Sequence, residues 1–133
     1  MTLSEYLLHF IGTPYVWAGD GTSVGGSGFD CSGLVLEGLW AMGLYRGGDL
    51  TAEGINKRLL KDGWKSPLKP KADDILFFGK SKITHVAVAI DERLMVEAGG
   101  GGSKCTSASK STGFVRIRPI ASRNDLCDIL RMQ

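Results

Sequence analysis

The feature of this sequence that most limits its fold is a change of hydrophobic period near Pro67. Before that point apolar residues recur at helical spacing, and after it they form short runs rich in Val, Ile, Leu and Phe. Helices are expected at residues 4–11, 30–42 and 51–62, with Ser4, Asp30 and Thr51 as caps, and strands at residues 74–78, 84–90, 94–98, 114–120 and 128–132. Helices followed by an antiparallel run of strands predict an α+β fold.

The length and charge of the chain narrow the classes of function. A chain of 133 residues predicts one domain over residues 1–133, because a second domain would be too short to bury its own core. A formal net charge of +2 is too small to indicate a nucleic-acid partner. No apolar run approaches the roughly 20 residues that span a bilayer, and the first residues lack the pattern of a signal peptide. We expect no nucleic acid, no membrane insertion and synthesis in the cytoplasm.

The three cysteines do not indicate a disulfide framework or a zinc site. The number of cysteines is odd, and their spacing is wide: they are Cys31, Cys105 and Cys127. Reduced thiols are the better expectation, with a bridge between Cys105 and Cys127 left open. Neither a metal nor an organic cofactor is expected.

Cys31 is the first candidate for chemistry. Asp30 is a good N-cap, which makes Cys31 the first residue of the second predicted helix. Unpaired backbone N–H groups and the positive end of the helix favour a thiolate there, and the thiolate is the nucleophilic form. The competing interpretation, which the residue type alone favours, is a small buried apolar side chain.

A nucleophilic thiol needs a base, and the chain has two histidines. His9 lies among apolar residues of the first helix, where a structural role is favoured. His85 begins an alternating strand and is the natural base. Glu97 lies in the strand that a hairpin at residues 91–93 pairs with the strand of His85, so it is the candidate to orient the base. On spacing alone, a solvent-facing Glu97 in an edge strand is equally compatible.

Four segments, in this order, closely resemble the motifs of the NlpC-type papain-like cysteine peptidases. They are Gly-Thr-Pro-Tyr-Val-Trp at residues 12–17, Gly-Phe-Asp-Cys-Ser-Gly-Leu-Val at 28–35, Asp-Ile-Leu-Phe-Phe at 74–78 and Ile-Thr-His-Val-Ala-Val at 83–88. Phe-Asp-Cys-Ser-Gly followed by a Thr-His-Val strand is a specific combination. The resemblance covers the chain from about Gly12 to Ala98.

The resemblance implies a papain-like core in which the helix bearing the nucleophile packs on a small antiparallel sheet. It also implies an endopeptidase that cuts peptidoglycan stem peptides, typically between γ-D-glutamate and a diamino acid. Cys31 takes the place of the nucleophile and His85 that of the base. The third polar residue of the family is most often histidine, and here the position is Glu97, so the expected site is Cys-His-Glu.

Four further residues are expected to bind substrate because they match the family motifs. Tyr15 takes the place of a tyrosine that lines the site and assists the oxyanion, and Trp17 belongs to the same motif. Asp30 and Ser32 take the places of residues that hold the free amine of the stem peptide. The glycine-rich segments at residues 18–28 and 99–102 depart from the family pattern and are expected to border the cleft.

Two other functions stay open from the sequence. One is an amidase or acyltransferase of the same fold, and the other is a non-catalytic binding or assembly module. The intact Cys31 and His85 argue against the second, because a binding module has no chemical need for them. Without a targeting pattern, delivery to the cell wall is expected to depend on a bacteriophage tail, a lysis system or an injecting secretion machinery.

Overall fold

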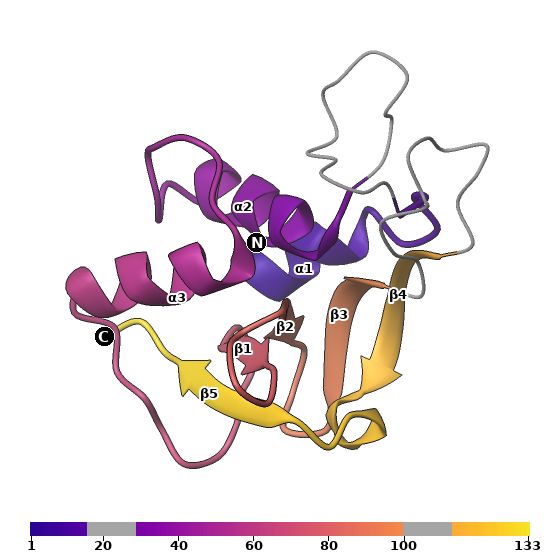
Figure 1. Ribbon diagram of the computed structural model, residues 1–133. Helices are drawn as coiled ribbons and strands as arrows, with labels where there is room; N and C mark the ends of the chain where they lie inside the picture. Colours follow the sequence, from indigo (N-terminus) through magenta and orange to yellow (C-terminus); the bar gives the residue numbers. More distant parts are fainter. Residues whose placement is uncertain (16–28, 100–112) are drawn as a thin grey trace.

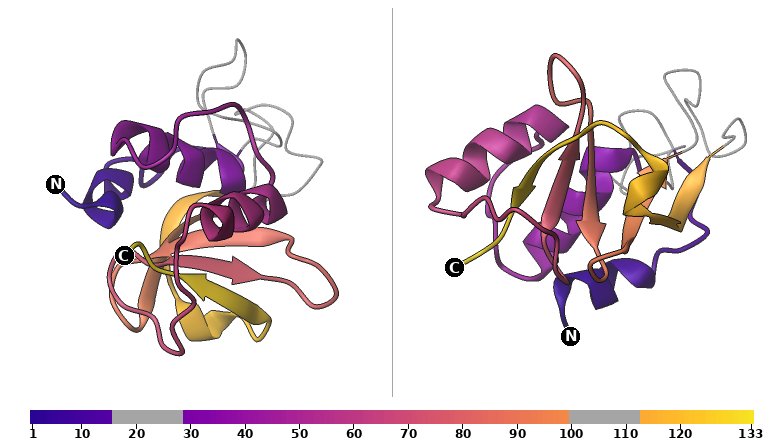
Figure 2. Two further views of the ribbon diagram at one scale, coloured as in Figure 1. Left: turned by 90° about the vertical axis from the view of Figure 1, so that its left-hand side faces the viewer. Right: turned by 90° about the horizontal axis from the view of Figure 1, so that it is seen from below.

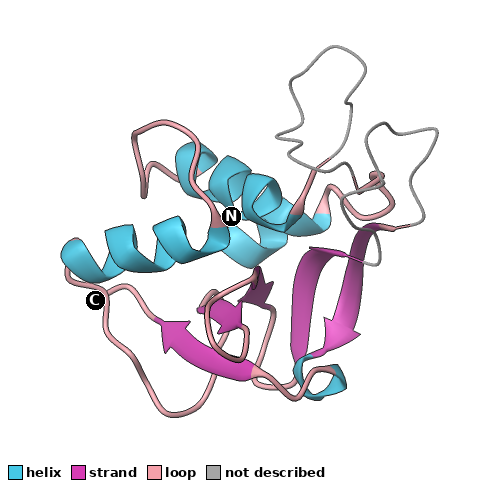
Figure 3. Ribbon diagram, in the orientation of Figure 1, coloured by secondary structure: helices cyan, strands magenta, loops and turns pink. Residues whose placement is uncertain are grey.

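Within the part of the chain that the structure describes, three helices lie over one face of a five-stranded antiparallel sheet, which confirms the α+β prediction (Figure 1, Figure 2, Figure 3). The computed structural model describes residues 1–15, 29–99 and 113–133. The helices are α1 (Leu3–Leu8), α2 (Cys31–Ala41) and α3 (Ala52–Lys61), and the strands are β1 (Ile75–Phe78), β2 (His85–Ala89), β3 (Leu94–Gly99), β4 (Phe114–Pro119) and β5 (Leu126–Leu130). The strand order is β4-β3-β2-β1-β5. No helix in the described ranges is long and apolar enough to cross a membrane.

Apolar residues are buried on both faces of the sheet. The cluster under the helices includes alternate strand residues, namely Ile75, Phe77, Val86, Val88, Val96 and Val115. The residues between them form a smaller cluster on the other face, namely Leu76, Phe78, Ala87, Ala89, Met95, Ile120 and Ile129. The 3-10 turn at Ile120–Ser122, which precedes β5, supplies one member of this second cluster. Strands packed on both sides hold the polar side chains at their ends in fixed positions.

Helix α2 forms as the sequence predicts. The Asp30 carboxylate accepts the backbone N–H of Gly33 at 2.7 Å, a cap that contributes about 1 kcal/mol. Gly43 follows the C-cap with φ +69°, the left-handed conformation that ends many helices. A Cβ at Gly38 would lie 2.6 Å from Leu3 Cδ1, so the missing side chain lets α1 pack closely on α2.

The first helix begins and ends earlier than predicted. Thr2, not Ser4, is its N-cap: the Thr2 hydroxyl accepts the N–H of Glu5, and the Glu5 carboxylate accepts the N–H of Thr2 at 2.8 Å. This capping box satisfies two N–H groups at once, which a Ser4 cap would not do. The helix ends at Leu8, so the predicted continuation to Ile11 is wrong.

The last strand is also displaced from its predicted place. It covers Leu126–Leu130 rather than residues 128–132. Its partner β1 decides the limits, because Leu130 pairs with Ile75 and Leu126 pairs with Phe78. The register shifts between Phe77 and Phe78, an irregularity that apolar spacing does not reveal.

Gly79 should be needed for the turn that leads from β1 into β2. Its φ is +151°, and a Cβ there would collide with the carbonyl oxygen of Lys82. We therefore expect Gly79→Ala to lower the free energy of unfolding by about 1–3 kcal/mol. Gly48→Ala is the matched control, because no described atom beyond its two chain neighbours lies within 4 Å of the added Cβ. Urea denaturation of both variants measures the difference, and equal stabilities would contradict the prediction.

Candidate active site

The start of α2 places Cys31 at the edge of a cleft. Cys31 is the first residue of the helix, directly after the Asp30 cap, and its side chain is half-buried. The preceding chain is fixed to the rest of the fold, because the Phe29 N–H donates to the Pro14 carbonyl at 3.1 Å and the Tyr15 N–H donates to the Gly113 carbonyl at 2.9 Å. The thiol therefore lies at the end of a helix that presents unpaired N–H groups.

His85, the first residue of β2, contacts both Cys31 and Glu97. Its Nε2 lies 2.8 Å from Oε1 of Glu97, and its side chain also hydrogen-bonds Cys31. The Phe78 ring packs against the imidazole with the ring centroids 5.6 Å apart. The three polar side chains thus come from α2, β2 and β3 and form one connected group.

Glu97 does not face solvent, which removes the alternative that its spacing left open. It is 1% exposed, and its strand β3 lies between β2 and β4. The Nε of Arg116 lies 2.9 Å from Oε2 of Glu97, and Nη1 of Arg118 lies 3.6 Å from the same oxygen. A buried carboxylate needs a hydrogen-bonded partner such as Arg116, since burying it alone costs several kcal/mol.

Hydrogen bonds and charges within this group shift the pKa values of His85 and Glu97. Burial opposes the imidazolium, but hydrogen bonds to Cys31 and Glu97 and their negative charges outweigh it and raise the pKa of His85 from 6.5 to about 9. Burial also opposes the ionised carboxylate, but His85 and Arg116 outweigh it and lower the pKa of Glu97 from 4.5 to about 2. At neutral pH the imidazole is therefore protonated and Glu97 is ionised.

A cleft of about 590 Å³ lies beside Cys31. It is lined by Tyr15, by residues 30–32 at the start of α2, by residues 49–53 at the start of α3, and by residues 82–84 before β2. Carboxylates at Asp30, Asp49 and Glu53 share the lining with apolar groups at Leu50, Ala52 and Ile83. The cleft thus offers both negative charge and apolar surface to a substrate.

Three of the four predicted binding residues line this cleft. Tyr15, Asp30 and Ser32 are among its walls, and the Ser32 hydroxyl donates to Asp30 Oδ1 at 3.3 Å. Trp17 lies outside the described residues, as do the glycine-rich segment at 18–28 and residues 100–112. Cys105 falls in the second of these gaps. Cys127 carries a free thiol that donates to the Phe77 carbonyl at 3.4 Å, so the expected reduced thiol is confirmed there.

Three features of the site were not predicted from the sequence: Arg116, Arg118 and the cleft wall at the start of α3. Residues 114–120 were expected only to form a strand. In the structure Arg116 pairs in register with Glu97, while Ile117 is 46% exposed. The signal for this contact was a pair of arginines at alternate positions, which place two cations on one side of a strand.

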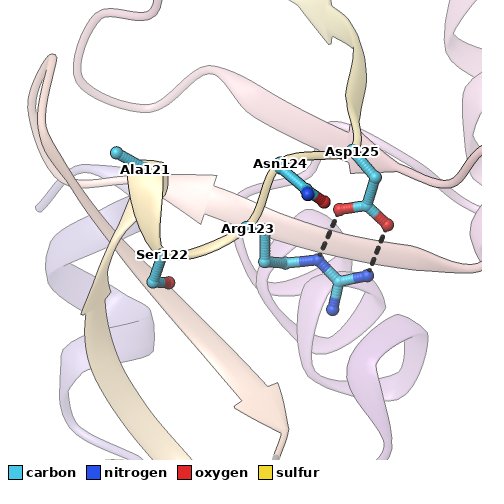
Figure 4. A pocket seen from close by; sticks show the side chains of 5 residues that line it. All are labelled: Ala121, Ser122, Arg123, Asn124 and Asp125. Atoms are coloured by element: carbon cyan, nitrogen blue, oxygen red, sulfur yellow. Dashed lines mark hydrogen bonds and ion pairs between the residues drawn. The ribbon is translucent and has the colours of Figure 1, made fainter.

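A shallower hollow of about 360 Å³ lies at residues 121–125, between the 3-10 turn and β5 (Figure 4). Arg123 and Asp125 form an ion pair across it at 2.8 Å, and the Arg123 guanidinium lies 5.1 Å from the centre of the Phe78 ring. The hollow and the cleft have no described lining residue in common. Among the residues described, no group of three or more His, Cys, Asp or Glu is placed to hold a metal ion.

Solved structures with the same fold include two peptidoglycan hydrolases and one non-catalytic protein. The NlpC/p60 domain of the peptidoglycan hydrolase SagA is 23% identical, with a TM-score of 0.69 over 98% of this chain and 97% of that one. RipB, a peptidoglycan hydrolase of Mycobacterium tuberculosis, is 23% identical, with a TM-score of 0.64 over 97% of this chain and 64% of that one. RipD of the same organism, a non-catalytic NlpC/p60 domain protein adapted to peptidoglycan binding, is 19% identical, with a TM-score of 0.67 over 100% and 99%.

The sequence itself decides the family. No curated protein matches the chain. The model of the NlpC/P60 family, however, matches residues 12–118, a span that holds Cys31, His85, Glu97 and Arg116. The chain therefore belongs to the NlpC/P60 family and has the fold of its peptidoglycan hydrolases.

Proposed function

We propose that the chain is a cysteine endopeptidase that hydrolyses peptidoglycan stem peptides at the bond between γ-D-glutamate and the diamino acid. The observation that carries the proposal is the position of His85, which contacts Cys31 and Glu97 at once. This is the arrangement of nucleophile, base and orienting group that acyl transfer needs. The peptidoglycan hydrolases SagA and RipB, which share the fold, support the choice of substrate.

Cys31 performs the first half of the reaction. The thiolate is the nucleophilic form of a cysteine, and the protonated His85 beside Cys31 is the counter-ion for it. The sulfur attacks the carbonyl carbon of the scissile amide, and the carbonyl oxygen takes up the negative charge. The backbone N–H at the start of α2 stabilises that oxygen, and Tyr15, which lines the same cleft, assists it.

His85 moves the protons in both halves of the reaction. Its imidazolium donates a proton to the leaving amine as the C–N bond breaks, which leaves an acyl-enzyme on Cys31. The neutral imidazole then takes a proton from water, whose oxygen attacks the thioester and releases the acid and the thiolate. Glu97 accepts the N–H of Nε2 throughout, so the other ring nitrogen stays directed toward the thiol.

Asp30 and Ser32 recognise the free amine of the stem peptide. Both line the cleft next to Cys31, and the Asp30 carboxylate supplies the negative charge that an ammonium group needs. Asp30 also caps α2, so substrate binding and the position of the nucleophile depend on the same side chain.

Two observations favour other functions. RipD shows that this fold also serves a non-catalytic protein, and binding to peptidoglycan without cleavage is the corresponding alternative here. The apolar groups at Leu50, Ala52 and Ile83 favour an amidase or acyltransferase of the same fold. Delivery by a phage tail or a secretion machinery stays a prediction.

Replacing the proposed nucleophile separates catalysis from binding. Cys31→Ala should abolish the release of peptides from purified sacculi and leave the far-ultraviolet circular dichroism unchanged, because alanine is compatible with the first turn of a helix. Cys127→Ala is the matched control and should keep full activity, since Cys127 lies on β5 and does not line the cleft. Wild-type protein that sediments with sacculi but releases nothing would favour a binding module instead.

A second prediction concerns the amine of the substrate. Acetylation of the amine of a synthetic stem peptide should lower kcat/KM about tenfold to hundredfold. That loss corresponds to the free energy of one hydrogen bond to a charged group. Asp30→Asn keeps a good helix cap but removes the charge, so it should bring the two substrates to similar rates. Mass spectrometry of the products measures both. Equal cleavage of the free and acetylated peptides by the wild type would exclude this recognition and favour the amidase or acyltransferase.

A third prediction concerns the alkaline limb of the pH profile. The reaction needs the imidazolium, so kcat/KM should fall as pH rises past about 9, the pKa of His85. Glu97→Gln removes a negative charge that raises this pKa, so the limb should move to lower pH by about one unit or more. Glu92→Gln, an exposed carboxylate in the hairpin after β2, is the control and should leave the limb in place. An unchanged limb in Glu97→Gln would show that Glu97 does not tune His85.

A further inference from the structure

We propose that Arg116 is a positioning residue that fixes the Glu97 carboxylate so that one of its oxygens faces His85. The inference deepens the proposed function, on which its relevance to hydrolysis rests. It concerns a residue of β4 that touches neither Cys31 nor His85 in the contacts described and would act through Glu97 alone.

The two oxygens of Glu97 have different partners on opposite sides. Oε1 meets His85 on β2 at 2.8 Å, and Oε2 accepts the Nε–H of Arg116 on β4 at 2.9 Å. A carboxylate held by one oxygen only can rotate about its last bond, whereas one held by both cannot. The Arg116 contact therefore determines where Oε1 points.

The backbone is built around this contact. Glu97 and Arg116 are direct partners in the pairing of β3 with β4, so the sheet itself brings them together. Gly99 leaves the space that they need: a Cβ there would lie 2.9 Å from Oε2 of Glu97 and 3.2 Å from Nη2 of Arg116. The pairing of β3 with β4 and the absence of a side chain at Gly99 thus both favour the contact between Glu97 and Arg116.

Other charges near Glu97 are less suited to this role. His85 faces it from β2, Arg118 from β4, and Arg123 from the segment before β5, with Cys31 beyond His85. The Arg118 Nη1 at 3.6 Å is too distant for a hydrogen bond. Arg123 is held by Asp125 through two hydrogen bonds, at 2.9 and 2.8 Å. Of the three arginines, Arg116 is the one that hydrogen-bonds Glu97, and Arg118→Gln is its matched control.

The test measures the reactivity of Cys31 without substrate. The protein is alkylated with iodoacetamide, and mass spectrometry follows the peptide that contains Cys31. Arg116→Gln should slow alkylation at pH 7 by about tenfold, because His85 is no longer held against the thiolate, whereas Arg118→Gln should stay within about twofold of wild type. Arg116→Lys keeps the charge without the fixed guanidinium geometry and should lose less than Arg116→Gln.

A double-mutant cycle with Glu97→Ala separates positioning from framework stability. If Arg116 acts through Glu97, Arg116→Gln should change alkylation by less than about twofold once Glu97 is removed. The defect of the single variant should also grow below about pH 5, because without Arg116 the Glu97 carboxylate takes up a proton at higher pH. Thermal melts accompany each variant, and the cycle is run with Arg116→Lys if Arg116→Gln does not fold.

An equal loss with and without Glu97, or wild-type alkylation in Arg116→Gln, would overturn the inference. The outcome is independent of the proposed substrate. Should wild type leave sacculi intact while the cycle gives the expected coupling, the peptidoglycan peptidase proposal fails and the positioning role of Arg116 stands.

Discussion

The buried carboxylate of Glu97 is the interaction on which the arrangement of the site depends. A carboxylate at 1% exposure has lost its water and is stable only with partners at both oxygens. His85 and Arg116 supply them from the two strands that flank β3. The register of three strands therefore sets the direction of the imidazole, and the apolar packing on both faces of the sheet keeps that register fixed.

Features encoded by neighbouring residues were visible in the sequence. The Asp30 cap and the first-turn position of Cys31 follow from residue order alone, and the structure has both. The hairpin between the second and third predicted strands was short enough to bring His85 and Glu97 to one region of the sheet. Which way Glu97 faces was not encoded locally, because it depends on whether another strand covers β3.

Features set by distant partners could not be predicted. Arg116 lies 19 residues beyond Glu97 in the chain, and only the pairing of β4 with β3 brings the two together. The limits of β5 depend on a register shift in its pairing with β1, between Phe77 and Phe78. The error in the first helix has a different cause. Its true start is marked by a local signal, the capping box of Thr2 and Glu5, whereas the predicted cap was Ser4.

The position of β4 at the margin of the sheet has a consequence for solubility. Residues 12–15 cover the first part of its outer edge, through hydrogen bonds to Gly113 and Val115. The remainder carries Arg116 and Arg118, both directed toward Glu97. Inward-directed charges on an edge strand oppose pairing with a strand of another molecule, because the added strand would bury these charges further. Arg116 and Arg118, which lie beside the reactive centre, thus also oppose aggregation through the β4 edge of the sheet.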